Sequence, residues 1–264
     1  GGRNRRLIWW TSIAASIVVL VVAGWWFGRE PEPKSGNVQI MAEAIQPGQS
    51  RAVVTLADGQ QVVLEQANRK IEESDGTVLH SDSGALVYMA NAEKTTAKVM
   101  YNTVSIPRGG EYRLELADGT KVWLNAATEL RFPVNFTGDM REVYLKGEAY
   151  FQVKRDEKHP FIVHTSMGAV EVLGTSFNVR DYEDEREVVT TLETGKVMYV
   201  SGNTREKVTL NPGYQVLEKE SSPVEVRKVD PLQYTGWREG KYVFEDVALE
   251  DIMRTLCRWY DIDV

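Results

Sequence analysis

The peptide bond between Gly174 and Thr175 could be cleaved by the chain itself, with water as the only other reactant. Thr175 follows Gly174, and a threonine hydroxyl can attack the carbonyl carbon of the preceding residue, which leaves an ester that water cleaves. The peptide must be distorted for this attack, and glycine tolerates backbone angles that strain other residues. The pair interrupts the strand-like run VLGTSFNV, residues 172–179. Since a glycine inside a strand usually marks a bulge or a close backbone approach, simple geometry is the alternative to self-cleavage.

The other residue types that carry chemistry form no recognisable site. His80, His159 and His164 lack the spacing of metal ligands to one another or to Cys257, so we expect no metal site and no cofactor. The acidic run DYEDE, residues 181–185, lacks the pattern of an EF-hand calcium loop and is more typical of a solvated hairpin tip. The sequence has no nucleophile elbow, phosphate-binding loop or dinucleotide fingerprint. We therefore expect no enzyme activity except a reaction of the chain on itself.

The elements that position these residues are predicted to be β-strands. Segments 53–64 and 114–125 repeat one pattern, in which Ala-Asp-Gly separates two strand-like runs, and Asp-Gly in that position is a strong hairpin signal. Short runs of β-branched and aromatic residues then continue at regular spacing to residue 200. This spacing favours an all-β sandwich or roll of antiparallel strands. With 42 % hydrophobic and 26 % charged residues in 264, the composition is that of an ordinary globular protein.

The pattern becomes helical near the C-terminus. One apolar stripe of an amphipathic helix is formed by Leu249, Ile252, Met253, Leu256 and Tyr260. Asp246 is the expected N-cap, and strand-like runs at 241–244 and 261–264 flank the helix. Together they predict a βαβ unit that is incomplete, because one such unit cannot bury its helix alone. We expect truncation here and also at the N-terminus, which starts Gly-Gly without methionine.

An uncharged segment near the N-terminus, residues 7–27, is long enough to cross a bilayer. Tryptophans lie at both of its ends, as in the aromatic belts of membrane helices. A cleaved signal peptide is the alternative, but its apolar core would be shorter and a small-residue cleavage site should follow. Arg3, Arg5 and Arg6 precede the segment, so the Lys/Arg bias favours a cytoplasmic N-terminus and puts the chain from Gly28 onward outside the inner membrane.

These features divide the chain into six parts. We expect a residual cytoplasmic end (1–6), a transmembrane helix (7–27), a periplasmic spacer (28–50), a first β-hairpin region (51–103), an all-β domain (104–230) and the start of a C-terminal module (231–264). The formal net charge of −7 argues against nucleic acid as a partner.

The chain from about residue 101 onward resembles the periplasmic part of the FecR family of transmembrane anti-sigma regulators. The residues that carry the resemblance are SIPRGG (105–110), LADGTKVWLN (116–125), GEAYF (147–151), HPFIV (159–163), VLGTSFNV (172–179), LNPG (210–213) and RWYD (258–261). Several motifs in one order are more specific than any one of them alone. The membrane segment and the spacer also stand where that family has them.

The resemblance implies a signal relay. In such systems a cytoplasmic N-terminal segment, which this sequence lacks, binds an extracytoplasmic-function sigma factor. The C-terminal end is similar to the small signalling domains called STN, and it meets the signalling domain of a TonB-dependent outer-membrane transporter. Site proteases then release the segment that governs the sigma factor. Some relatives cleave themselves at a Gly-Thr pair in the position of Gly174 and Thr175.

Two expectations follow for location and partner. The protein is expected to pass once through the inner membrane, with its N-terminus in the cytoplasm and its C-terminal domain in the periplasm. Its partner-binding surface is expected on the C-terminal helix, at Leu249, Ile252, Met253, Leu256, Trp259 and Tyr260. The alternative function is a membrane-anchored β-sandwich that binds envelope glycan, which would need exposed aromatic residues in line on one face.

Overall fold

The computed structural model describes residues 49–64, 69–72, 77–82, 85–89 and 99–263. The expected cytoplasmic end, the transmembrane segment and nearly all of the spacer lie outside these residues. Among the helices that the model does describe, none combines the length and the apolar character that a membrane span requires.

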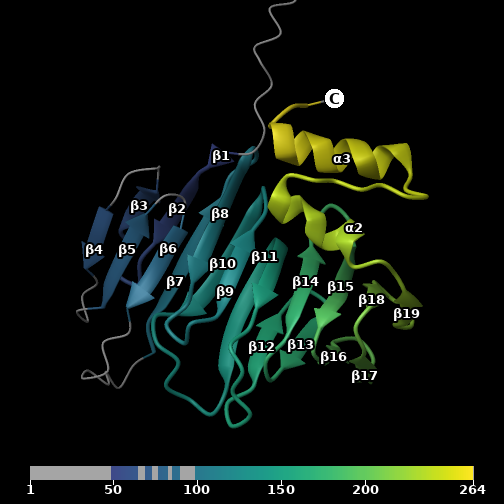
Figure 1. Ribbon diagram of the computed structural model, residues 1–264, viewed down its shortest axis with the longest axis horizontal. Helices are drawn as coiled ribbons and strands as arrows, with labels where there is room; N and C mark the ends of the chain where they lie inside the picture. The colour runs from purple at the N-terminus through teal and green to yellow at the C-terminus, as the bar shows by residue number, and fades with distance from the viewer. Residues whose placement is uncertain (1–48, 65–68, 73–76, 83–84, 90–98, 264) are drawn as a thin grey trace, which may run out of the picture. The chain divides into compact units, whose positions relative to one another are not determined.

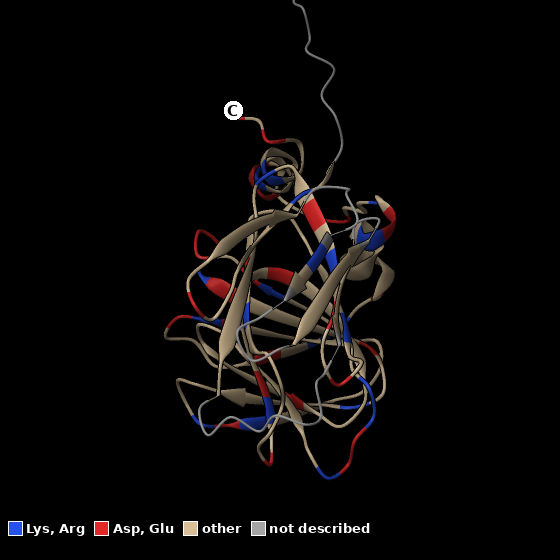
Figure 2. Cartoon of the chain, turned by 90° about the vertical axis from the view of Figure 1, so that its left-hand side faces the viewer, with Lys and Arg blue, Asp and Glu red and all other residues tan. Residues whose placement is uncertain are grey.

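The described strands form one long sheet that curls so that its two halves face each other (Figure 1, Figure 2). The first half contains, in spatial order, β3 (Gln61–Leu64), β2 (Ala52–Thr55), β7 (Tyr101–Ile106), β10 (Thr128–Pro133), the first part of β11 (Arg141–Gln152), β12 (Phe161–His164), β13 (Gly168–Val172), β16 (Val197–Ser201) and β17 (Lys207–Leu210).

The second half is built in the same way around the other end of β11. Its spatial order is β4 (Arg69–Glu72), β5 (Val78–Asp82), β6 (Ala85–Met89), β8 (Gly110–Glu115), β9 (Lys121–Leu124), the last part of β11, β14 (Ser176–Asp181), β15 (Glu187–Thr194), β18 (Tyr214–Lys219) and β19 (Glu225–Lys228). The short strand β1 (Gln49–Ser50) adds to β8.

Strand β11 crosses from one half to the other at Gly147. Up to Lys146 it pairs with β10, and from Gly147 onward it pairs with β14. Gly147 has a φ of +100°, and a Cβ at this position would lie 2.6 Å from Thr128 Oγ1. Both observations exclude a larger residue, because L side chains rarely adopt this φ and the space is already filled.

The core lies between the two halves. Every second residue of β7 is buried, as expected when one face of a strand packs inward. The largest fully buried side chains include Phe132, Phe151, Phe161 and Phe177, and the rings of Phe151 and Phe177 stack 5.3 Å apart. The predicted mainly β fold is confirmed. The strands are not all antiparallel, however, since β1 with β8, β6 with β8 and β11 with β12 pair in parallel.

The two predicted Asp-Gly hairpins are both present. They close β2 with β3 and β8 with β9, and their glycines, Gly59 and Gly119, have φ values of +88° and +86°. In each turn the aspartate accepts a hydrogen bond from the backbone N–H two residues later, Asp58 from Gln60 at 2.8 Å and Asp118 from Thr120 at 2.9 Å. The repeat is therefore one turn used once in each half of the sheet.

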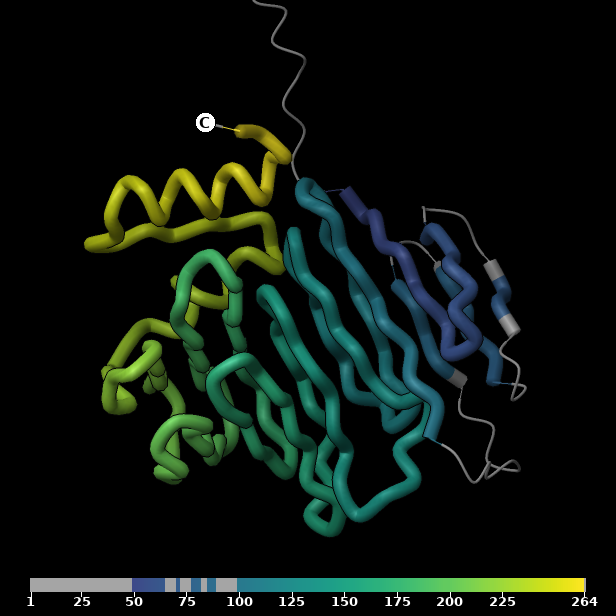
Figure 3. The backbone as a smooth tube through the Cα atoms, turned by 180° about the vertical axis from the view of Figure 1, so that it is seen from behind, coloured from purple at the N-terminus to yellow at the C-terminus, as the bar shows by residue number. Residues whose placement is uncertain are grey.

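The C-terminal region contains helices but no strands within the described residues. Helix α2 (Leu232–Thr235) and the 3₁₀ helix η1 (Gly236–Glu239) precede α3 (Leu249–Tyr260), which is the helix that the sequence predicts. Residues 241–244 run beside α3 without a strand partner (Figure 3), so the βαβ prediction is wrong for this part of the chain. The predicted N-cap is also wrong, because the helix begins after Ala248.

Candidate functional site

Helix α3 packs on the β structure through its polar face. Thr255, Arg258 and Trp259 are its buried residues, whereas Leu249, at the start of the apolar stripe, is 72 % exposed. The helix lies across one end of the strands (Figure 1). The stripe that the sequence predicts is present, but it is not the face that docks. We call the contact between the C-terminal region, residues 232–263, and the β structure the joint.

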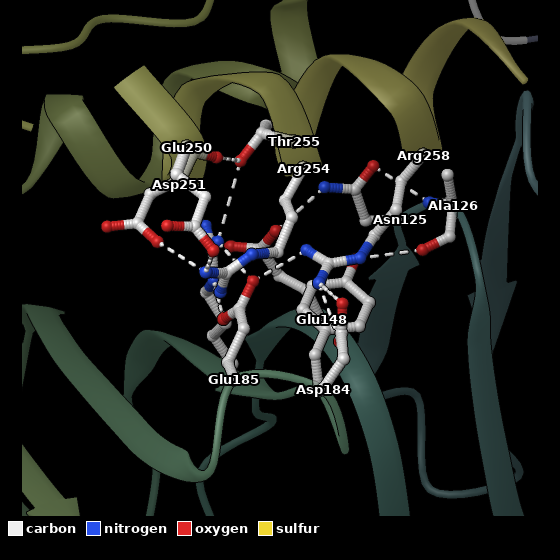
Figure 4. A network of polar contacts seen from close by, with 12 residues as sticks. Asn125, Ala126, Glu148, Asp184, Glu185, Glu250, Asp251, Arg254, Thr255 and Arg258 are labelled. Atoms are coloured by element: carbon white, nitrogen blue, oxygen red, sulfur yellow. Dashed lines mark hydrogen bonds and ion pairs between the residues drawn. The ribbon is translucent and has the colours of Figure 1, made fainter. Parts of the chain in front are cut away.

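Arg258 anchors the helix to the loop between β14 and β15 (Figure 4). Its Nη2 donates to both carboxylate oxygens of Asp184 at 2.7 Å, and its Nη1 donates to Glu185 Oε1 at 2.6 Å. The guanidinium carbon also lies 3.8 Å from the centre of the Tyr182 ring, which makes a cation–π contact. The acidic run 181–185 was predicted to be a solvated hairpin tip. It forms the tip between β14 and β15, and Glu183 and Asp184 are exposed, but the run also binds the helix through Asp184 and Glu185.

Glu185 is shared by two arginines. Arg180 on β14 donates to both of its carboxylate oxygens, from Nε at 2.6 Å and from Nη2 at 2.5 Å, and Arg258 donates to one of them. Burial alone would raise the pKa of Glu185, but the hydrogen bonds and charge of Arg180, with the charge of Arg258, outweigh it and lower that pKa. The carboxylate stays ionised, and removal of one partner would leave a poorly solvated charge.

A second carboxylate, Glu148 on β11, lies beneath the helix and is only 4 % exposed. Its two oxygens accept hydrogen bonds from Asn125 Nδ2 at 2.8 Å and from Asn178 Nδ2 at 2.9 Å. Burial raises the pKa of Glu148. The C-terminal region completes this network, because Trp237 Nε1 donates to Asn178 Oδ1 at 3.1 Å and the Tyr242 hydroxyl donates to Asn125 Oδ1 at 3.3 Å.

The end of α3 is held by the turn between β7 and β8. Arg108 Nη1 pairs with Asp263 at 2.6 Å, and its Nη2 donates to the carbonyl oxygen of Cys257 at 3.2 Å. The backbone N–H of Gly109 donates to the Arg258 carbonyl at 2.8 Å. A Cβ on Gly109 would lie 3.1 Å from Asp261 Cβ. The turn therefore satisfies carbonyl groups that the helix leaves open at its C-terminus and needs a glycine to do so.

Motifs that are far apart in the sequence thus converge on the joint. SIPRGG supplies Arg108, LADGTKVWLN supplies Asn125, GEAYF supplies Glu148 and RWYD supplies Arg258. None of these four residues was predicted to be a site residue, although a glutamate within the apolar run of β11 is a signal of a buried carboxylate. Among the described residues, no three or more His, Cys, Asp or Glu side chains are grouped to hold a metal ion.

The Gly174–Thr175 bond lies at a corner between the two halves of the sheet. Residues 172–179 are not one interrupted strand, since β13 ends at Val172 in the first half and β14 begins at Ser176 in the second. A Cβ on Gly174 would lie 2.7 Å from the Cα of Arg155, so close approach of another backbone explains this glycine. The irregularity in strand register is instead between Ser176 and Phe177.

The hydroxyl of Thr175 is held by the turn after β15. Thr175 is 5 % exposed; its Oγ1 donates to the Lys196 carbonyl at 2.8 Å and accepts from the Lys196 N–H at 3.3 Å. Gly195 has a φ of +92°, and a Cβ there would lie 2.8 Å from Thr175 Oγ1 and 3.1 Å from the Gly174 carbonyl oxygen. A pocket of about 380 Å³, lined by these residues, opens beside the bond. The Thr175 hydroxyl and the Gly174 carbonyl oxygen therefore border the same glycine, beside this pocket.

Comparison with known proteins points to one family. No curated protein matches the sequence. The family model "FecR protein" matches residues 102–198, and the model "FecR, C-terminal" matches residues 241–264. Two crystal structures of "a putative anti-sigma factor from Parabacteroides distasonis ATCC 8503" each share 34 % sequence identity with this chain. One has a TM-score of 0.59 and covers 61 % of this chain and 76 % of its own, and the other has a TM-score of 0.58 with 60 % and 74 %. The chain belongs to the FecR family.

The two FecR matches meet at the joint. Arg108, Glu148 and Glu185 lie in the segment that the first family model matches, and Arg258 lies in the segment that the second matches. The FecR-type β domain and the FecR C-terminal segment are therefore held together by ion pairs and buried hydrogen bonds. They form one compact unit from Ile45 to Val264.

The residues expected to bind a partner are divided by the structure. Leu249 is largely exposed, and Ile252, Met253, Leu256 and Tyr260 are half-buried, so the stripe remains accessible. Trp259 is only 5 % exposed and packs edge-on against Tyr242 with ring centres 5.2 Å apart, so it belongs to the joint. Beside the stripe lies a groove of about 1060 Å³, whose lining includes Leu249, Met253, Cys257 and Tyr182.

Proposed function

We propose that this FecR-family chain is an inner-membrane anti-sigma factor, which relays a signal from a TonB-dependent outer-membrane transporter to an extracytoplasmic-function sigma factor. Its family and its similarity to the anti-sigma factor structures support the class of function. One observation carries the relay. The polar face of α3 binds the β domain, while the apolar stripe on the same helix stays open to a second protein.

The proposed partner surface is the apolar stripe of α3 together with the groove beside it. Exposed apolar residues that are rimmed by charges are typical of protein-binding sites, and Leu249 and Met253 both line the groove. In this proposal the signalling domain of the transporter binds there. Site proteases would act afterwards, once the signal has arrived.

A pull-down with the full-length protein tests this surface. Leu249→Ser is expected to weaken capture of the transporter's signalling domain by about tenfold, because it places a hydroxyl in an apolar contact. Val63→Ser is the matched control, since Val63 is 53 % exposed on β3 and lies outside the stripe. Equal capture by both variants would contradict the surface, and no capture by the wild type would contradict the relay.

The proposed topology puts the β domain in the periplasm and the sigma factor in the cytoplasm. The uncharged segment 7–27 and the arginines before it support this orientation. A reporter that is active only in the periplasm, fused after Val200, is expected to be active. A silent periplasmic reporter, with an active cytoplasmic reporter at the same position, would reverse the orientation.

Self-cleavage between Gly174 and Thr175 is a further part of the proposal. Thr175 Oγ adds to the Gly174 carbonyl carbon, the hydroxyl proton passes to the amide nitrogen and the C–N bond breaks, which leaves an ester and a free amine. Water then hydrolyses the ester to a Gly174 carboxylate and restores the threonine hydroxyl. The position of both oxygens beside Gly195, and the pocket next to the bond, support this reaction.

Mass spectrometry of the purified chain tests the cleavage. The wild type is expected to give fragments that end at Gly174 and begin at Thr175, and hydroxylamine should trap the ester as a hydroxamate. Thr175→Val keeps the shape of the side chain without its hydroxyl, so it should stay intact. A wild-type chain that remains whole after prolonged incubation would count against the reaction.

The alternative function, glycan binding, is not favoured by the outer face of the sheet. Tyr144 is 37 % exposed there, but its ring stacks on His164 at 4.8 Å, and Arg131 lies 5.3 Å from its centre. Arg131 also lies 4.0 Å from the centre of the Tyr101 ring. The rings of Tyr144 and Tyr101 are therefore already in contact with other side chains of the protein.

A further inference from the structure

The hairpin of β14 and β15 connects the joint to the Gly174–Thr175 bond. Strand β14 starts directly after Thr175 and ends at Asp181, and β15 returns from Glu187 to Thr194. The loop between them binds Arg258 of α3. The turn that follows β15 holds the Thr175 hydroxyl through Lys196. The two candidate sites are therefore the two ends of one hairpin.

The C-terminal region contacts this hairpin at three places along its length. At the loop, Arg258 binds Asp184 and Glu185. In the middle, Trp237 donates its indole N–H to Asn178, and both residues are at most 3 % exposed. These two contacts fix the loop and β14.

The third contact lies near the cleavage bond. Arg238 of η1 pairs with Glu193 at 3.6 Å, two residues before Gly195, and its guanidinium carbon lies 3.5 Å from the centre of the Tyr150 ring. The Tyr150 hydroxyl donates to Glu193 as well. Burial and this bond raise the pKa of Tyr150 to about 12, so the hydroxyl stays protonated and keeps donating at neutral pH.

The strand register is irregular just after the Gly174–Thr175 bond, where movement of the hairpin would displace Thr175. Ser176 faces Thr194, but Phe177 faces Leu192, so Glu193 has no direct partner on β14. Bulges of this kind bend a strand and aim neighbouring side chains. Glu193, which the irregularity leaves without a partner on β14, is the residue that Arg238 and Tyr150 bind.

We propose that docking of the C-terminal region on the β14–β15 hairpin sets the position of the Thr175 hydroxyl, so that self-cleavage depends on whether α3 is docked. This regulation rests on the proposed cleavage at Gly174–Thr175. When α3 is docked, the hairpin holds Lys196 against Thr175. When α3 is not docked, the loop loses its contact with Arg258, the hairpin becomes less rigid along its length and cleavage slows. Arg258 is then a positioning residue that acts through the hairpin.

A matched pair of variants in the full chain tests the coupling. Arg258→Gln removes the ion pairs to the hairpin, whereas Arg254→Gln removes ion pairs only to Glu250 and Asp251 of the same helix. We expect Arg258→Gln to slow the appearance of the 175–264 fragment about fivefold or more, and Arg254→Gln to leave it unchanged. Asp184→Asn removes one of these pairs from the hairpin side and should also slow it.

Amide hydrogen exchange separates failure of the coupling from failure of the cleavage. In Arg258→Gln, exchange should accelerate in peptides covering 176–180, on the hairpin, and 196–200, just beyond its end, and in Arg254→Gln it should not. If the wild type never cleaves but this exchange pattern is seen, the cleavage is wrong and the coupling through the hairpin stands. If the wild type cleaves and the Arg258 and Asp184 variants match it in rate and in exchange, the coupling is overturned.

Discussion

Glu148 illustrates how a single side chain can fix the geometry of the joint. Both of its oxygens accept N–H groups from asparagines, and neither asparagine can turn its oxygen toward the glutamate. The oxygen of Asn125 already accepts from the Ala126 N–H at 2.8 Å, and that of Asn178 accepts from Trp237. The site is therefore built for a group with two acceptor oxygens, which glutamine cannot supply.

Replacement of Glu148 by glutamine is expected to destabilise the protein by about 1–3 kcal/mol, because one buried amide N–H would face another donor. Thermal unfolding measures this cost, and an unchanged midpoint in Glu148→Gln would contradict the assignment.

Gly195 offers a test of geometry at the cleavage site. Gly195→Ala would place a Cβ 2.8 Å from Thr175 Oγ1 and should slow cleavage by about tenfold or more, since the hydroxyl must move. Gly59→Ala is the control for backbone strain, because Gly59 has a similar φ of +88° and nothing within 4 Å of a Cβ. The rate of fragment formation is the measurement. Similar rates in the two variants would contradict the placement of the Thr175 hydroxyl against Gly195.

At the scale of elements, the sequence predicts α3 well but not the way it docks. Its 3.6-residue period defines the apolar stripe, and a stripe usually faces the core. Here Arg258 forms ion pairs with Asp184 and Glu185, and the Trp259 ring packs against Tyr242. These partners lie in other elements, so periodicity within the helix carries no information about them. For the same reason residues 241–244 read as a strand, because their composition is strand-like although no neighbouring strand is present in the described part of the chain.

Two substitutions in α3 test which face docks. Trp259→Ala should lower the free energy of unfolding by about 3 kcal/mol, as expected when a buried tryptophan is truncated. Leu249→Ala should change it little, because that side chain is 72 % exposed. Urea unfolding of both variants measures the difference. The reverse order of the two effects would mean that the apolar stripe is the docked face.

At the scale of the whole molecule, the sequence predicts the strands and the two Asp-Gly turns but not how strands are shared between the halves. Alternation of buried and exposed residues is the same in either half, so nothing in 172–179 shows that β13 and β14 lie on different sides of the core. The crossing of β11 at Gly147 is hidden for the same reason. Only contacts distant in sequence, such as Thr128 against Gly147, define it.

Because β11 belongs to both halves, they should unfold together. Gly147→Ala is expected to cost about 3 kcal/mol or more, since it adds a steric clash to a strained φ, and to lower the midpoint for the whole domain. Circular dichroism and tryptophan fluorescence should then give one coincident transition. Gly138→Ala is the control, with no atom closer than 3.9 Å to its Cβ. Two separate transitions in the wild type would show that the halves are independent.

The sharing of strands across the corner at Gly174 gives a cut chain an unusual mechanical property. Strands β11 and β13 precede the bond and their partners β14 and β16 follow it, so the two pieces would stay together through strand pairing and a shared core, with no covalent bond between them. A pull on the piece that carries α3 would then separate the two pieces along these strand pairs. The piece left behind would have bare strand edges and an uncovered core, which proteases attack readily. A cut at this bond would therefore let a pull on the C-terminal piece expose the N-terminal piece to proteases.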